Sequence, residues 1–263
     1  MKEHAMLLAI DIGNTHTVLG GFVKGKLAAE ARLTSNRERT EDELWFSVKS
    51  FLDDRKLTPK QIEGVVIASV VPVLAEAYTK MAAKYLQAEP LIVSSKLDLG
   101  MTIHYADPAT LGADRICTTV AAFKKYGGPA IVVDFGTATT YDVISKQGDF
   151  LGGVIAPGVE TAAGELFRRT AQLPAVEFRF PPAVLGTDTR TSIQSGVLYG
   201  AVEGSDGLIR RIKRVAGKHA IVIATGGHAK LIAEMSHEIR YVQPSLVLEG
   251  ARLIYERVRR KKK

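Results

Sequence analysis

Apolar and polar positions follow one pattern at two places in the chain. At each place an apolar run ends in Asp, a further apolar residue and Gly, and polar residues then lead into a second apolar run. The first stretch reads LAIDIGNTHTVLGGF (residues 8–22) and the second reads IVVDFGTATTYD (residues 131–142). Short apolar runs on either side of a glycine-bearing polar turn are typical of paired strands. We therefore expect a hairpin at each place.

The residues after the first hairpin predict a mixed sheet covered by helices. The expected strands lie at residues 26–34, 62–70 and 91–93. One expected helix follows the N-cap Thr40, and a second runs from Pro72 to residue 86. A further helix is expected to begin at Pro108. It ends at Gly127-Gly128-Pro129, where we expect a domain boundary.

The second half repeats this order of elements. Strands are expected at residues 130–134, 141–145, 150–156 and 221–224, and helices at 158–167, from about Thr191 past Ile212 and from about Ala229. A repeated β-β-β-α-β-α-β order predicts two related α/β domains, residues 1–127 and 128–263, hinged around a central cleft.

Composition indicates a globular cytoplasmic protein. The chain has 263 residues, of which 46% are hydrophobic, and no apolar run approaches the roughly 20 residues that span a bilayer. The single cysteine, Cys117, excludes an internal disulfide and agrees with a reducing compartment. The net charge of +7 is concentrated in residues 251–263, which hold seven basic residues and one Glu. Because this excess lies at the end of a helix, where it stays solvated, we do not expect a nucleic-acid partner. Since no apolar run is long enough to span a bilayer, we do not expect a membrane partner either.

Both polar turns suit a phosphate group. Gly13 lets an anion approach the backbone, and Asn14, Thr15 and Thr17 offer neutral donors. Asp11, at the end of the first strand, can hold a divalent ion directly or through water. The second turn carries matching residue types at Asp134, Gly136, Thr137 and Thr139. The pair suggests two related halves that bind one nucleotide.

A third glycine-rich stretch is a less suitable phosphate loop. GGFVKGKL (residues 20–27) nearly matches the pattern G-x-x-x-x-G-K-[ST], but Leu27 replaces the hydroxyl residue that would bind magnesium, and no helix follows directly. We expect a plain hairpin turn at residues 24–26.

Five segments together closely resemble the type III pantothenate kinases. They are Asp11–Thr15, Gly112–Arg115, Asp134–Thr139, Gly152–Gly158 and Ser192–Gly196. The resemblance runs nearly end to end and implies two ribonuclease-H-like domains of the acetate and sugar kinase, Hsp70 and actin superfamily, each with a mixed five-stranded sheet. It also implies a homodimer and the ATP-dependent phosphorylation of pantothenate, the first step of coenzyme A biosynthesis.

The resemblance implies where ATP and its ions bind. The second phosphate loop is centred on Thr137, and Asp134 takes the position that binds a potassium or ammonium ion in the family. Asp11 would steady the magnesium ion carried with ATP, through water. The segment Ala224–Gly227 resembles the adenosine side of the family's site. The first phosphate loop consists of Asp11, Ile12, Gly13, Asn14, Thr15, His16, Thr17 and Val18.

The resemblance also implies the pantothenate-binding residues, which are Tyr105, Gly112, Ala113, Asp114, Arg115 and Thr189. Asp114 is the predicted general base for the primary hydroxyl of the substrate. Arg115 cannot readily lose its proton, which suits it to the substrate carboxylate or to the migrating phosphoryl group. Thr189 would reach in from the partner chain. Asp188 replaces the family's usual Asn and adds a negative charge near an anionic substrate.

Two other functions stay open at this stage. One is another kinase or phosphatase of the same superfamily, acting on a sugar or on polyphosphate. The other is a nucleotide-sensing regulator without catalysis, although neither a helix-turn-helix nor a basic face supports it. The product formed from ATP, magnesium, potassium and pantothenate would separate the three.

Overall fold

The computed structural model describes residues 5–261 and divides into two compact units. The first unit comprises the chain up to Ala121 together with the segment from Leu246 onward, and the second comprises Ala122–Ser245. The sequence placed the boundary at residue 127 and the last helix in the second half. The contacts instead group that helix with the first sheet. Within residues 5–261, no helix is long and apolar enough to cross a membrane.

The first unit is built on a five-stranded sheet with the order β3-β2-β1-β4-β5. β1, β2 and β3 pair in antiparallel fashion, whereas β4 and β5 continue the sheet in parallel. The strands are β1 (Met6–Ile12), β2 (His16–Val23), β3 (Lys26–Thr34), β4 (Ile62–Ser69) and β5 (Leu91–Ile92).

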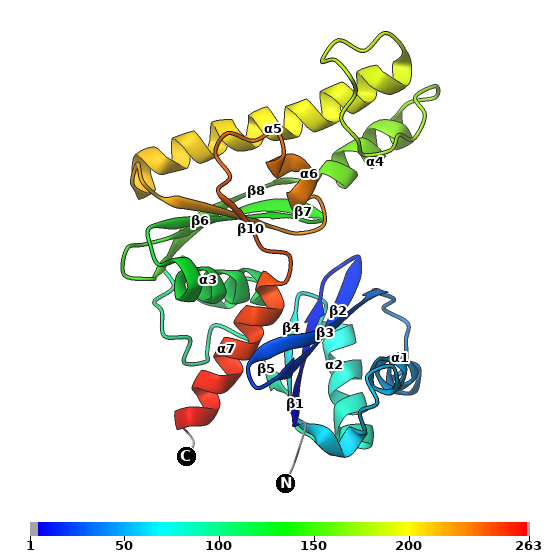
Figure 1. Ribbon diagram of the computed structural model, residues 1–263, viewed down its shortest axis with the longest axis vertical. Coiled ribbons are helices and arrows are strands. Elements are labelled where there is room, and N and C mark those ends of the chain that lie inside the picture. Colours follow the sequence, from blue (N-terminus) through cyan, green and yellow to red (C-terminus); the bar gives the residue numbers. More distant parts are fainter. Residues whose placement is uncertain (1–4, 262–263) are drawn as a thin grey trace. The chain divides into compact units, whose positions relative to one another are not determined.

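Helices cover both faces of this first sheet (Figure 1). On one face, α1 (Glu41–Asp53) and α2 (Pro72–Met81), which continues as a π turn at Ala82–Leu86, pack on alternate residues of β1. The opposite face carries α7 (Leu246–Lys261). Gly64 makes this packing possible, because a Cβ at that position would lie 1.6 Å from the Tyr255 hydroxyl oxygen.

Local sequence signals place several of these elements. The predicted strand at residues 26–34 is confirmed, and so is the N-cap Thr40, which forms a capping box with Glu43. The helix expected from Pro108 begins later. Pro108–Thr110 forms only a 3-10 turn, Leu111 is extended, and α3 (Ala113–Tyr126) starts two residues further on.

The second unit repeats the first topology. Its sheet has the order β10-β9-β6-β7-β8, with β6, β7 and β8 antiparallel and β9 and β10 parallel to β6. Two helices, rather than one, separate its third and fourth strands. The elements are β6 (Ala130–Phe135), β7 (Ala138–Ile144), β8 (Phe150–Pro157), α4 (Val159–Arg169), α5 (Thr189–Ala216), β9 (Ile221–Thr225), α6 (Ala229–Ala233) and β10 (Tyr241–Val242).

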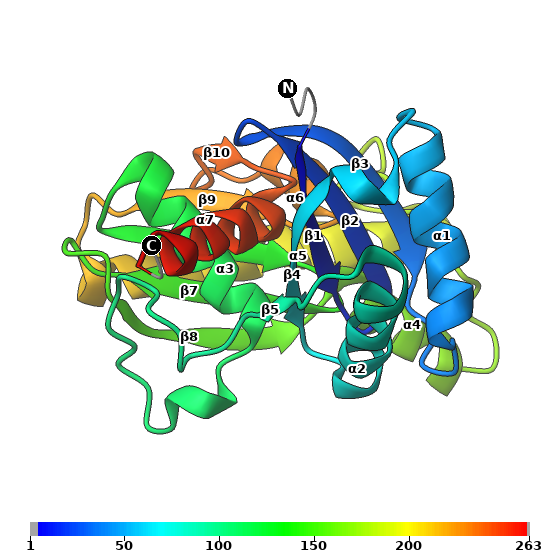
Figure 2. The same ribbon diagram turned by 90° about the horizontal axis from the view of Figure 1, so that it is seen from below.

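The long helix α5 runs along one face of the second sheet, as Figures 1 and 2 show. Its 28 residues correspond to about 42 Å at 1.5 Å per residue. Leu198, Val202 and Ile209 recur at helical spacing, and all three are buried in the core of this unit. The duplicated mixed five-stranded sheets predicted from the sequence are therefore confirmed.

Candidate active site

The turn between β1 and β2 is a short loop whose middle is open to solvent. The Gly13 N–H donates to the carbonyl oxygen of His16 at 3.0 Å, and the strands pair directly below it, Ile12 opposite Thr17. Asn14, Thr15 and His16 are exposed, whereas Asp11 is half-buried at the end of β1. The loop therefore presents polar residues to solvent at the end of the sheet.

The turn between β6 and β7 has the same construction with one residue fewer. The Gly136 N–H donates to the Ala138 carbonyl oxygen at 3.1 Å, and Phe135 pairs with Thr139 as Ile12 pairs with Thr17. Both threonines are buried, at 1% exposure for Thr17 and 4% for Thr139. They sit in the framework of their loops, below the exposed residues.

The second loop is supported by the start of α4. The Gly158 N–H and the Thr161 hydroxyl both donate to the Thr137 carbonyl oxygen, at 3.1 and 2.6 Å. A Cβ on Gly158 would lie 2.2 Å from the Gly136 carbonyl oxygen, so only glycine allows this approach. The position of Thr137 is therefore fixed by the glycine at the N-cap of α4.

Asp134 lies against the glycine turn that follows β9. It pairs in register with Thr225, and a Cβ on Gly226 would lie 2.3 Å from its Oδ1 atom. Gly226 also has a φ of +91°, which favours glycine. Gly226 thus leaves space beside the Asp134 carboxylate that a side chain would fill. Within residues 5–261, no cluster of three His, Cys, Asp or Glu side chains is arranged to hold a metal ion.

Asp114 stands in the first turn of α3, mostly shielded from solvent. The Arg115 N–H donates to its Oδ1 atom at 2.8 Å. A Cβ on Gly112 would lie 2.4 Å from the same oxygen, so the glycine leaves room for the carboxylate. Burial raises the pKa of Asp114 above its ordinary value of 3.8, against the lowering effect of Arg115. A carboxylate with a raised pKa is a stronger proton acceptor.

Asp114 lies in the same neighbourhood as Asp11. Burial raises the pKa of the Cys117 thiol well above its ordinary value, and the negative charges of Asp11 and Asp114 raise it further. Both carboxylates therefore lie near this one buried sulfur, one turn into α3. The predicted base and the first residue of the first phosphate loop thus both lie within electrostatic reach of the Cys117 thiol.

The other predicted substrate residues of the first unit gather around Asp114. Arg115 is buried, and its guanidinium carbon lies 5.9 Å from the ring centre of Tyr105. The contact joins the loop before α3 to the helix itself. Tyr105, Gly112, Asp114 and Arg115 therefore form one local group.

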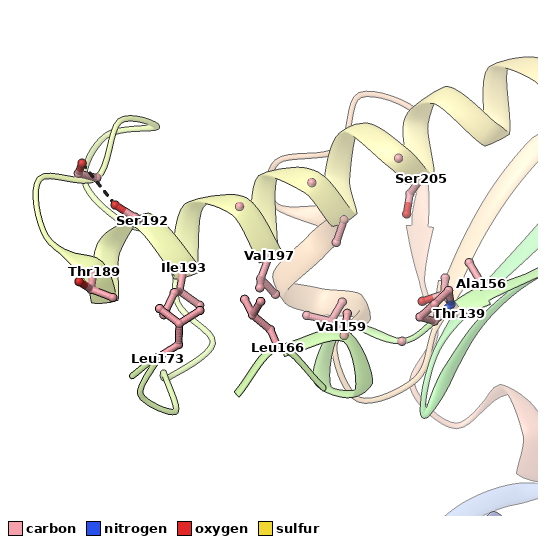
Figure 3. A pocket seen from close by; sticks show the side chains of 18 of the residues that line it. Thr139, Ala156, Val159, Leu166, Leu173, Thr189, Ser192, Ile193, Val197 and Ser205 are labelled. Carbon is pink, nitrogen blue, oxygen red and sulfur yellow. Dashed lines mark hydrogen bonds between the residues drawn. The ribbon is translucent and has the colours of Figure 1, made fainter. Parts of the chain in front are cut away.

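Thr189 is the first residue of α5 and lines a pocket of about 950 Å³ in the second unit (Figure 3). Leu166, Leu173, Ile193 and Val197 point into this pocket, which makes it largely apolar. On the same side of α5, Gly196, Gly200 and Gly204 have open space where a Cβ would be.

Asp188 has a structural role that the sequence did not reveal. It is the N-cap of α5 and accepts a hydrogen bond from the Thr191 N–H at 2.9 Å. That bond holds the pKa of the Asp188 carboxyl below its usual value. Asp and Asn are equally good N-caps, so a cap explains why either residue serves at this position.

The segment after β3 was missed by sequence reasoning. Ser35 and Arg37 both donate hydrogen bonds to the first phosphate loop. The only signal in the sequence is a polar run, SNRERT, between a strand and a helix cap, and such a run is typical of any loop.

Nearly the whole chain is similar to known proteins. The family model described as type III pantothenate kinase matches residues 7–211. A type III pantothenate kinase of Moorella thermoacetica is 46% identical over 96% of this chain and 99% of its own, and one of Bacillus cytotoxicus is 42% identical over 96% of both.

Solved structures show the same fold at low identity. A protein of Campylobacter jejuni described as a Baf family transcriptional activator gives a TM-score of 0.59 at 19% identity, over 95% of this chain and 98% of its own. MreB 5 of Spiroplasma citri, bound to AMPPNP, gives 0.57 at 12% identity over 98% of both. These likenesses confirm the duplicated ribonuclease-H-like fold of the actin-like ATPases.

Proposed function

Since this chain belongs to the type III pantothenate kinase family and so phosphorylates pantothenate with ATP in coenzyme A biosynthesis, we propose a role for each residue of its site. The observation that carries the proposal is the Asp114 carboxylate, which is mostly shielded from solvent, held by the Arg115 N–H at 2.8 Å and given room by Gly112. A cytoplasmic location belongs to the same proposal, because the reaction consumes ATP.

Asp114 is the general base in this proposal. Its free oxygen accepts the proton of the substrate's primary hydroxyl while that oxygen attacks the γ-phosphorus. The Arg115 N–H holds the other oxygen in place. The raised pKa keeps the carboxylate more basic than an exposed aspartate, and Gly112 leaves it unobstructed.

Arg115 and Tyr105 bind the anionic substrate. Arg115 stays protonated, so it can pair with the pantothenate carboxylate or with charge on the migrating phosphoryl group. The Tyr105 ring beside the guanidinium fixes its orientation. Positioning of this kind can supply on the order of 7–11 kcal/mol of a phosphoryl-transfer barrier.

The first phosphate loop, Asp11–Val18, binds the phosphates of ATP. Its exposed residues supply donors, and its Asp11 carboxylate is of the hard oxygen type that magnesium prefers. Magnesium held there, through water, would offset negative charge on the phosphates.

The second loop, with Thr137 at its centre, also contacts ATP in this proposal. Asp134 would hold a monovalent cation, which fits the space that Gly226 leaves beside its carboxylate. Such a cation would add positive charge near the phosphates. Assays in sodium and then in potassium or ammonium test this assignment, because full activity in sodium alone would contradict it.

A homodimer through the face of α5 completes the proposal. The apolar side chains exposed around this region include Ile155, Phe167, Val184 and Leu185. The helix α5 also offers a glycine-lined surface over which a second helix could lie closely. Thr189 of one chain would then contact substrate held by the other. A mass measurement in solution tests the dimer, with and without Gly200→Arg, which should yield monomers that have lost turnover.

The decisive variant for the base is Asp114→Asn. Asparagine keeps the shape and can still accept the Arg115 N–H bond, but it cannot take the proton. We expect turnover to fall roughly 10²-fold or more, with ATP binding little changed. Retained turnover would remove Asp114 from this role.

A further inference from the structure

The segment Ser35–Arg37, which connects β3 to the cap of α1, lies against the first phosphate loop. The Ser35 N–H donates to the Thr15 carbonyl oxygen at 2.9 Å, and the Ser35 hydroxyl donates to the Gly13 carbonyl oxygen at 2.7 Å. The same hydroxyl lies 2.9 Å from the Thr17 hydroxyl. One serine thus contacts three residues of the eight-residue first phosphate loop and holds its backbone in place.

Arg37 contacts a side chain of the loop instead. Its Nη2 atom donates to Oδ1 of Asn14 at 3.1 Å. A guanidinium has only donors, so it can pair with the oxygen of an asparagine amide and not with the nitrogen. The bond therefore selects one of the two amide orientations. It leaves the Nδ2 hydrogens of Asn14 as donors on the other side.

The position of Arg37 is itself fixed by the chain around it. The Glu38 N–H donates to Oδ1 of Asn36 at 3.0 Å, which forms a tight turn around Arg37. Ser35 ties one end of this turn to the loop, and the capping box of Thr40 and Glu43 ties the other end to α1. The arginine thus leaves the chain from a turn with both ends anchored.

We propose that Arg37 is a positioning residue for ATP: it orients the Asn14 amide so that its N–H groups donate to a phosphate oxygen, while Ser35 holds the loop backbone. The inference rests on the proposed role of this loop. The guanidinium of Arg37 also adds a positive charge next to the anion. An asparagine without this contact would present either its oxygen or its nitrogen to the phosphate, and the oxygen repels it.

A double-mutant cycle on ATP binding tests this role without relying on turnover. ATP dissociation constants are measured by calorimetry for the wild type, Arg37→Ala, Asn14→Ala and the double variant. We expect each single variant to bind ATP about 10-fold more weakly. The ATP dissociation constant of the double variant should lie within about threefold of that of either single variant, because Arg37 acts through Asn14. Arg37→Lys should bind within about threefold of the wild type, since lysine can also donate to Oδ1.

Lys26→Ala is the matched control, because Lys26 is an exposed cation at the opposite end of β3. It should bind ATP as the wild type does. Unchanged binding by Arg37→Ala would overturn the inference, and so would a roughly 100-fold loss in the double variant, which would mean independent action. If the wild type bound ATP without phosphorylating pantothenate, the proposed function would fail while the cycle still decided the role of Arg37.

Discussion

Gly158→Ala should lower kcat/KM for ATP, because it displaces the second phosphate loop. Gly158 has an ordinary extended conformation, with φ −69° and ψ 160°, so alanine introduces no backbone strain there. The effect is purely steric. The new Cβ would lie 2.2 Å from the Gly136 carbonyl oxygen and 2.5 Å from that of Thr137. Backbone oxygens cannot rotate away, so the loop has to move.

The size of the effect follows from these distances. Relief of the 2.2 Å contact requires a displacement of about 1 Å, and a misplacement of that size can lower a rate by about 10²-fold. The Gly158 hydrogen bond to Thr137 is stretched at the same time. We expect kcat/KM for ATP to fall roughly 10- to 100-fold, and the free energy of unfolding to fall by about 1–3 kcal/mol, which is typical of overpacking.

Gly164→Ala provides the control in the same helix. A Cβ at Gly164 has nothing within 4 Å, so alanine should stabilise α4 by roughly 0.5–1 kcal/mol and leave the kinetics unchanged. Steady-state kinetics with varied ATP and thermal unfolding of both variants give the answer. Gly158→Ala with wild-type kinetics for ATP would refute the link between this glycine and nucleotide binding.

Three further outcomes are expected. Asp188→Ala should lower the free energy of unfolding by about 1 kcal/mol in a urea titration, while Asp188→Asn should match the wild type, because only alanine loses the cap of α5. Asp114→Asn should unfold at the same or a higher temperature than the wild type above pH 4. A carboxyl whose pKa is raised in the folded state lowers the free energy of unfolding as the pH rises through the window just above 3.8. Asparagine does not ionise, so the variant avoids this loss of stability. Gly64→Ala should destabilise the first unit by roughly 1–3 kcal/mol, since its Cβ meets Tyr255 of α7; chemical unfolding with unchanged stability would contradict that packing.

Local features of the sequence predicted the elements well. The two hairpins, the capping box at Thr40 and the repeated order of strands and helices depend on residues a few positions apart. Apolar periodicity and turn chemistry report such short-range preferences directly. The two glycine-bearing polar turns were equally visible, because their polar residues stand next to glycine in the chain.

Long-range packing was beyond the reach of those patterns. The contact of α7 with the first sheet depends on Gly20 and Gly64, which leave room for Leu248 and Tyr255 about 190 or more residues later. Nothing near these glycines in sequence shows what fills the space. Ser35 and Arg37 were missed for the same reason, since their partners lie across a hairpin and their own residue types are common in loops.

The carboxyl of Asp114 was identified by resemblance, but its environment came from the structure. The sequence showed an acid followed by an arginine, and an exposed pair of that kind contributes little. Burial, the Arg115 N–H bond and the space left by Gly112 are what distinguish this carboxylate from a surface residue.

The pH dependence of pantothenate phosphorylation, measured together with an NMR titration of the Asp114 carboxyl in the free enzyme, tests the assignment of the base most directly. The structure predicts that kcat/KM falls on the acid side as one proton binds, with a midpoint above 3.8 that coincides with the titration of Asp114. A carboxyl that titrates at or below 3.8, or an acid limb that persists unchanged in Asp114→Asn, would contradict it.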